Sequence, residues 1–185
     1  YLISDEPYAE IVFDGIKVPS VLKAYPDSIL AYSYSKTLSV PGERIGYIAV
    51  NPAIDESSDL IDAIILCTRI SGFVNAPALM QRVIARLQDT KVDVEVYQKK
   101  RDLLCGGLSK AGYQFALPQG AFYLFVKSPL ADDVKFTEKL IEQNILAVPG
   151  SGFGAPGYFR IAYCVDDKVI AGSMEGFAAA IRECV

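Results

Sequence analysis

Lys36 lies in a run of residues whose types suit covalent chemistry with an aldehyde. Ser33 and Ser35 come just before it, and Arg44 and Gly46 follow shortly after. A lysine amine becomes an imine-forming nucleophile when desolvation or a nearby cation favours its neutral form. Hydroxyl groups, backbone N–H groups and a guanidinium are donors that hold a phosphate. The run therefore indicates a cofactor that carries both an aldehyde and a phosphate, and pyridoxal phosphate carries both.

Two more chemical groups stand near the start of the chain. Asp5 and Tyr8 follow the apolar residues 1–3, so we expect a carboxylate and a phenol together at the end of a strand. With later motifs they resemble the class I/II aminotransferases, pyridoxal-phosphate enzymes of fold type I, and the resemblance covers nearly all of the chain. The motifs that carry it are Asp5-x-x-Tyr8, Ser33-x-Ser35-Lys36, Arg44-x-Gly46 and Tyr158-Phe159-Arg160-Ile161.

The resemblance implies a role for three residues at the cofactor ring. Lys36 would form the Schiff base, give it up to the substrate amine, and then move a proton between the substrate Cα and the cofactor carbon. Asp5 would pair with the pyridine nitrogen and keep it protonated, so that the ring can accept electrons. Tyr8 would hydrogen-bond the phenolic oxygen. Taken alone, Lys36 could be solvated, Asp5 could cap a turn, and Tyr8 could be a packed ring with an exposed hydroxyl.

The resemblance also implies which residues hold the phosphate and the substrate. Ser33 and Arg44 would bind the phosphate, with Ser35 as a further candidate, because a guanidinium fork grips two oxygens while a hydroxyl takes a third. Arg160 would bind the substrate α-carboxylate, which needs planar two-point recognition. The alternatives are that the serines belong to an ordinary turn and that Arg160 points from its strand into solvent.

The expected activity is transfer of an amino group between an amino acid and a 2-oxo acid by a homodimer. A lyase or synthase of the same fold stays open, because elimination and transfer use the same Lys36, Asp5 and Arg160 up to the carbanion. In the resembling family a long portion with part of the phosphate cradle precedes the Asp-x-x-Tyr motif, whereas this sequence opens directly on a strand. We therefore expect the later part of a longer enzyme, which would be catalytically incomplete alone.

The composition argues against several other classes of chemistry. The 185 residues contain no histidine, which removes Ser-His-Asp and Cys-His catalysis and the commonest zinc ligand, so no metal is expected. The net charge of −4 is made of interspersed acidic and basic residues, which predicts neither a nucleic-acid stripe nor a membrane patch. The cysteines are widely spaced without a C-x-x-C pair, which indicates reduced thiols in a cytoplasmic protein.

Residues 1–90 are predicted to be the later part of a mainly parallel-sheet cofactor domain, because strands alternate with helices in an α/β pattern. Short apolar runs at 1–4, 29–33 and 45–50 predict strands covered on both faces. Asp14-Gly15 predicts a tight turn between the apolar residues 11–13 and 16–18. Helices are predicted over 53–69 and around 81–85.

Residues 91–185 are predicted to be a small α+β domain that includes a bridging helix over 91–111, ended by Gly112. Runs at 113–117 and 121–126 predict a hairpin, and Asp132 or Asp133 should cap a helix that runs to residue 143. Further strands are expected over 145–148 and 159–164, before a terminal helix. The loop 150–154 lacks the following helix that a dinucleotide loop needs. It resembles the Pro-Gly-x-x-Phe-Gly loop of the same family, with Phe153 near the pocket.

Overall fold

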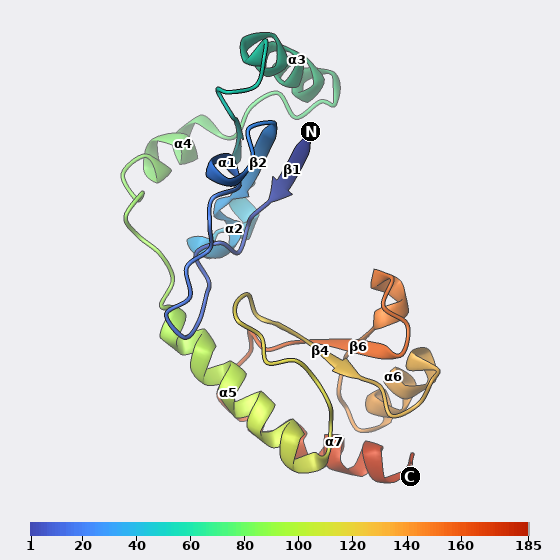
Figure 1. Ribbon diagram of the computed structural model, residues 1–185. Coiled ribbons are helices and arrows are strands. Elements are labelled where there is room, and N and C mark those ends of the chain that lie inside the picture. Colours follow the sequence, from blue (N-terminus) through green and yellow to red (C-terminus); the bar gives the residue numbers. More distant parts are fainter. Residues whose placement is uncertain (185) are drawn as a thin grey trace. The chain divides into compact units, whose positions relative to one another are not determined.

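The computed structural model describes residues 1–184 and divides into two compact units, residues 1–92 and 93–185 (Figure 1). Each unit has its own small sheet and its own helices. The mixed α/β fold predicted from the sequence is confirmed. The assignment of residues 1–90 to a cofactor domain and of 91–185 to a small domain stays a prediction, because it refers to a larger protein.

The first unit is built on a three-stranded sheet in the order β1-β2-β3. Strand β1 (Leu2–Asp5) runs parallel to β2 (Ser28–Ser33), and β3 (Gly46–Val50) lies antiparallel on the other side of β2. The three strands confirm the apolar runs read from the sequence, to within a residue or two at each end. The predicted cover on both faces is wrong for the described chain, because Ile3 of β1 and Ile48 of β3 are exposed. The central strand β2 ends at Ser33, which is the first of the predicted phosphate-binding residues in the run that leads to Lys36.

Helices and short turns connect these strands. Helix α1 (Val21–Ala24) lies between β1 and β2. The single turn α2 (Tyr34–Thr37) and the 3-10 turn η1 (Pro41–Glu43) lie between β2 and β3. After β3, the two predicted helices are present as α3 (Ser57–Ile70) and α4 (Ala78–Ile84). Several large apolar side chains of α3 and of the segment after it are exposed, among them Ile70 and Phe73.

The tight turn predicted at Asp14-Gly15 is present, although no hairpin surrounds it in the described residues. The amide of Ile16 bonds the carbonyl of Phe13 at 3.1 Å, and both turn residues have positive φ, as a tight turn requires. The flanking residues do not form a regular strand pair in the described part of the chain. Local turns occupy the preceding backbone, since Ile11 N bonds the carbonyl of Tyr8, and an isolated two-stranded hairpin is only marginally stable.

The second unit packs three helices on one side of an antiparallel sheet. The strands are β4 (Tyr123–Lys127), β5 (Val148–Pro149) and β6 (Tyr158–Ala162), in the order β4-β6-β5. The helices are α5 (Val94–Ala111), α6 (Asp133–Glu142) and α7 (Asp167–Arg182), and α7 packs along α5 (Figure 1). The 3-10 turn η2 (Gly150–Phe153) follows β5. The predicted α+β arrangement is confirmed.

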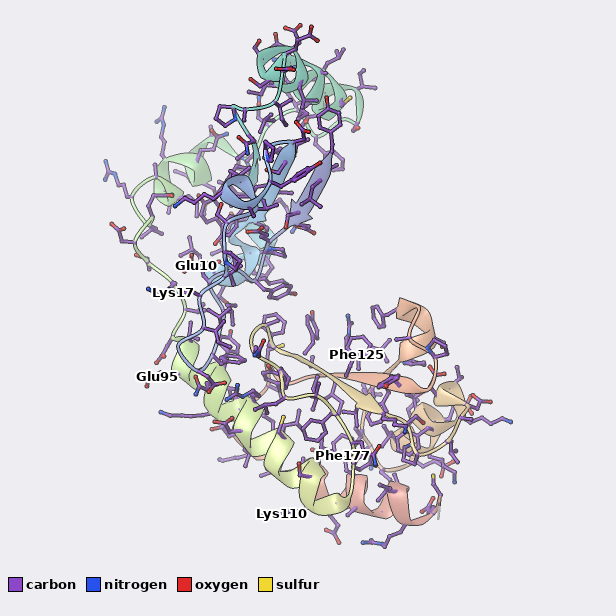
Figure 2. The ribbon with its side chains drawn as sticks, viewed as in Figure 1. Glu10, Lys17, Glu95, Lys110, Phe125 and Phe177 are labelled. Atoms are coloured by element: carbon purple, nitrogen blue, oxygen red, sulfur yellow. The ribbon has the colours of Figure 1, made fainter. Side chains whose placement is uncertain are left out.

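Aromatic rings fill the core of the second unit. Tyr113 contacts the rings of Phe136, Phe159 and Phe177, and its hydroxyl donates to the carbonyl of Phe177 at 2.9 Å. Figure 2 marks Phe177 in this core. The helix ends agree with the sequence, since Asp132 caps α6 through Lys135 N. The paired strands therefore rest on a well-packed layer.

Two strands of the second unit are shorter than predicted. Residues 113–117 meet β4 through a bridge between Phe115 and Val126 and a backbone bond from Lys127 N to the carbonyl of Gln114, and the described residues form no regular strand pair there. The predicted hairpin is therefore wrong. The side chain of Tyr113 is held in the core, and buried Arg101 binds the carbonyl of Pro118, which leaves little chain free to follow β4. The strand expected over 145–148 is reduced to β5, because residue 145 still closes the end of α6.

Candidate functional site

The predicted cofactor residues of the first unit gather at one edge of its sheet. Asp5 is the last residue of β1 and pairs in register with Ala31, while Ser33 is the last residue of β2. Gly46 begins β3 and pairs with Ser33, so the chain from α2 to η1 forms the connection at this same edge. The carboxyl ends of parallel strands are the places where open α/β sheets bind ligands.

Gly46 has a structural reason within the Arg44-x-Gly46 motif. A Cβ at this position would lie 2.3 Å from the carbonyl oxygen of Tyr32 and 3.2 Å from the Cα of Ser33. Only glycine lets β3 approach β2 this closely. In this motif Arg44 supplies the side chain for chemistry, whereas Gly46 is needed because β3 packs too close to β2 for any side chain.

Ser33 and Ser35 form a hydroxyl pair at the start of α2. Ser33 Oγ donates to Ser35 Oγ at 2.9 Å and accepts from the backbone N–H of Ser35 at 3.2 Å. The Ser33 side chain thus caps the single helical turn that carries Lys36. This local bonding fixes the direction in which the chain leaves β2, which explains why the two serines and the lysine stand so close in sequence.

Lys36 and Tyr8 are brought together from different parts of the unit. Lys36 is half-buried, and its Nζ lies 6.0 Å from the centre of the Tyr8 ring. Tyr8 lies in a turn that follows β1, which the bonds from Ala9 N to the carbonyl of Glu6 at 3.3 Å and from Ile11 N to the carbonyl of Tyr8 at 2.9 Å close. An amine and a phenol therefore face the same space beside the carboxyl edge of the sheet.

Arg44 lies in the connecting turn and is exposed. It ends η1 with φ 50°, a left-handed conformation that is uncommon outside glycine, and its Nη1 donates to the carbonyl of Pro41 at 2.8 Å. The structure thus places Arg44 at the predicted edge, with its guanidinium engaged inside its own turn. Asp5 is likewise exposed at this edge.

Arg160 belongs to the second unit. The alternative that its side chain points freely into solvent is not what the structure has, because two aromatic rings lie against it. It sits in β6 directly across from Phe125 and is half-buried. Its guanidinium carbon lies 4.4 Å from the centre of the Tyr123 ring and 4.0 Å from that of Phe153. The sequence predicted only a strand for the segment of Tyr123, and only the alternation of side chains along a strand could have signalled that the ring shares a face with Arg160.

A cavity of about 400 Å³ in the first unit was not anticipated. Three tyrosines line it, Tyr32, Tyr34 and Tyr47, with ring centres 5.2 to 6.0 Å apart. Tyr32 shares a 2.5 Å hydrogen bond with Thr37, and burial raises the pKa of the Tyr32 phenol. Because neighbouring residues of a strand point to opposite faces, Tyr32 lies on the other face of β2 from Ser33.

The described part of the chain has neither a metal-binding cluster nor a helix that could span a membrane. Within residues 1–184, no group of three or more His, Cys, Asp or Glu side chains is arranged to hold a metal ion. In the same part of the chain, no helix combines the length and the apolar character needed to cross a membrane. The four cysteines are free thiols, as predicted.

Comparison with known proteins decides the family. The family model described as aminotransferase class I and II matches residues 1–175. The chain belongs to the class I and II aminotransferases. Members of this family are generally dependent on pyridoxal phosphate.

Named members of the aminotransferase family match almost the whole chain. It is 30% identical to an aspartate/prephenate aminotransferase of Thermus thermophilus over 96% of its length, and 30% identical to LL-diaminopimelate aminotransferase 2 of Nostoc over 90%. A crystal structure of an aminotransferase from Eubacterium rectale superposes with a TM-score of 0.95 at 46% identity, covering 98% of this chain and 46% of that one. The match covers 47% and 44% of the first two relatives. The chain therefore spans about half the length of these aminotransferases.

Proposed function

We propose that this chain provides the later part of a pyridoxal-phosphate-dependent aminotransferase, which transfers an amino group between an amino acid and a 2-oxo acid. The observation that carries the proposal is the placement of the Lys36 amine beside the Tyr8 ring, at the carboxyl edge of β1 and β2. Family membership supports the reaction type. The relatives are named for different amino acids, so the substrate is proposed only as a class.

The residues at this edge fit the chemical groups of the cofactor. The hydroxyl pair of Ser33 and Ser35 and the guanidinium of Arg44 supply donors for a phosphate, and the amine of Lys36 supplies the group that holds an aldehyde covalently. Asp5 supplies a carboxylate for a protonated ring nitrogen. When bound, pyridoxal phosphate provides an acceptor for the electron pair released at the substrate Cα.

Each side chain then has a separate task. Lys36, half-buried, takes the proton from the substrate Cα in its neutral form and returns it to the acceptor atom. Asp5 keeps a proton on the ring nitrogen, and Tyr8 donates a hydrogen bond to the phenolic oxygen. Arg160 holds the α-carboxylate through two parallel N–H bonds, which orient the substrate as well as bind it.

We further propose a cytoplasmic homodimer. Free cysteines throughout the chain suit a reducing compartment. Exposed apolar residues on α3 and after it, such as Ile70 and Phe73, suit burial against further protein.

The proposal is tested by two substitutions in the complete protein that should fail in different ways. Arg160→Lys keeps the charge but loses the fork, so it should chiefly weaken amino-acid binding. Asp5→Ala should chiefly slow removal of the Cα proton, because one pKa unit lost at the ring nitrogen corresponds to about 1.4 kcal/mol. Stopped-flow measurement of the half-reaction separates the two effects.

Product analysis completes this test. Transfer predicts a new amino acid only when an oxo acid is added. If ammonia and an oxo acid arose from a single substrate, the reaction would be an elimination and the transfer assignment would fall. If Asp5→Ala raised only the substrate dissociation constant, its assignment to the cofactor ring would be withdrawn.

A further inference from the structure

The sheet of the second unit has two chemically different faces. Alternate residues of its strands, such as Leu124 and Phe159, are buried in the core. The intervening residues Tyr123, Phe125 and Arg160 point to the opposite face, because Phe125 and Arg160 are directly paired and Tyr123 is two residues from Phe125. Arg160 therefore lies among aromatic residues on the face away from the core.

The rings of Tyr123 and Phe153 lie against the guanidinium of Arg160. The ring centres of Tyr123 and Phe153 are 4.4 and 4.0 Å from its central carbon, well inside the range of about 6 Å in which a cation is attracted to a ring. Phe125, marked in Figure 2, meets Phe153 edge to face with ring centres 5.8 Å apart and planes at 84°. The ring on the guanidinium is thus itself supported by a second ring.

The loop that carries Phe153 is anchored at both of its ends by one carboxylate. Asp133, at the start of α6, is buried and accepts hydrogen bonds from Ser151 N at 2.8 Å and Gly157 N at 3.3 Å. The bond from Ser151, with the weaker one from Gly157, holds the pKa of Asp133 below its usual range. Gly150 completes the tight loop, since a Cβ there would lie 2.2 Å from the carbonyl oxygen of Ala155.

We propose that Tyr123 and Phe153 are positioning residues that fix the plane of the Arg160 guanidinium, so that its two-pronged edge is presented to a carboxylate. Phe125 and Asp133 serve this arrangement by holding Phe153 in place. The inference rests on the proposed role of Arg160 in binding the substrate carboxylate. It adds the means by which that arginine is oriented before any ligand arrives.

The physical gain is preorganisation. A free arginine side chain has several rotatable bonds, and ordering them on binding weakens affinity. Rings packed on the guanidinium restrict these bonds in the unbound protein and leave the N–H edge available. A bidentate pair depends on the orientation of this edge, so affinity for a carboxylate should depend on the rings even though they do not form hydrogen bonds with it.

The first measurement follows the motion of the guanidinium without any ligand. In the complete protein with arginine-selective ¹⁵N labelling, the Nε–Hε order parameter of Arg160 should be high and should fall in Phe153→Leu and in Tyr123→Leu. Phe153→Tyr keeps a ring and should restore the wild-type value. Tyr158→Leu, which changes an exposed aromatic residue on the same strand, is the matched control. An order parameter unchanged by loss of either ring would overturn the inference.

The second measurement follows carboxylate binding. Maleate is a suitable probe, since a Thermus thermophilus aspartate aminotransferase was solved with it. Each Leu variant should weaken maleate binding about two- to tenfold and the double variant more, the size expected when a side chain must be ordered on binding. Phe153→Tyr and Tyr158→Leu should bind as wild type, and the cofactor absorption band should be unchanged in all of them.

The outcomes separate this inference from the function on which it rests. Maleate binding unchanged in the Leu variants but weakened in Arg160→Lys would overturn the aromatic positioning alone. Maleate binding unchanged in Arg160→Lys would remove the proposed role of Arg160 and the inference with it.

Discussion

Replacing Gly46 by alanine should damage the candidate site through the backbone alone. The added Cβ would stand 2.3 Å from the Tyr32 carbonyl oxygen, more than 1 Å inside the roughly 3.5 Å at which non-bonded atoms pack. Strands β2 and β3 must therefore separate where Ser33 pairs with Gly46. Overpacking costs about 1 to 3 kcal/mol, and weakening the neighbouring bond from Tyr34 N to the Ile45 carbonyl adds about 0.5 to 1.5 kcal/mol.

Gly42→Ala is the matched control for this change, because a Cβ at Gly42 meets nothing within 4 Å. Urea unfolding of the complete protein should show a loss of about 2 to 4 kcal/mol for Gly46→Ala and a change within about 0.5 kcal/mol for Gly42→Ala. Cofactor affinity should fall with Gly46→Ala, since Ser33 moves with β2. Equal stability of the two variants would refute the close-approach argument.

Three further outcomes are expected. Tyr113→Phe should lower the free energy of unfolding by about 1 to 3 kcal/mol in urea, because the buried carbonyl of Phe177 loses its donor. Burial raises the pKa of the Tyr113 and Tyr163 phenols above 10.0, so the folded state holds these protons more tightly than the unfolded state. Stability should therefore be steady below about pH 10 and fall above it; a flat profile of urea midpoints from pH 9 to 11.5 would contradict this. The 185-residue chain alone should self-associate through exposed residues such as Ile3 and Phe73 and lack aminotransferase activity; a monodisperse, active monomer in light scattering and turnover assays would contradict this.

The residues of the first unit could be predicted because their positions are local in sequence. Ser33, Ser35 and Lys36 lie within a single turn, so a motif of side-chain types specifies their neighbourhood almost completely. The end of β1 at Asp5 follows from a short apolar run. The tyrosine-lined cavity was missed because Tyr32, Tyr34 and Tyr47 meet only after β2 and β3 pair.

The surroundings of Arg160 and the short strands depended on tertiary context. Tyr123 lies far from Arg160 in sequence, and Phe153 lies in the loop just before β6. Strand register brings the first ring to Arg160, and the anchored loop brings the second. The run 113–117 has strand-like residues, yet the core position of Tyr113 decides its path. A local sequence pattern reports intrinsic strand preference but contains no information on contacts between distant residues, so it could not predict where these strands end.

The central claim is that Lys36 is the residue that holds the cofactor, and one measurement tests it most directly. The complete protein, supplied with pyridoxal phosphate, is reduced with borohydride, digested, and analysed by mass spectrometry for the modified peptide. The account predicts a single cofactor adduct on Lys36, and loss of both the adduct and the visible absorption band in Lys36→Ala. A reducible adduct on another lysine that persists in Lys36→Ala would contradict the account.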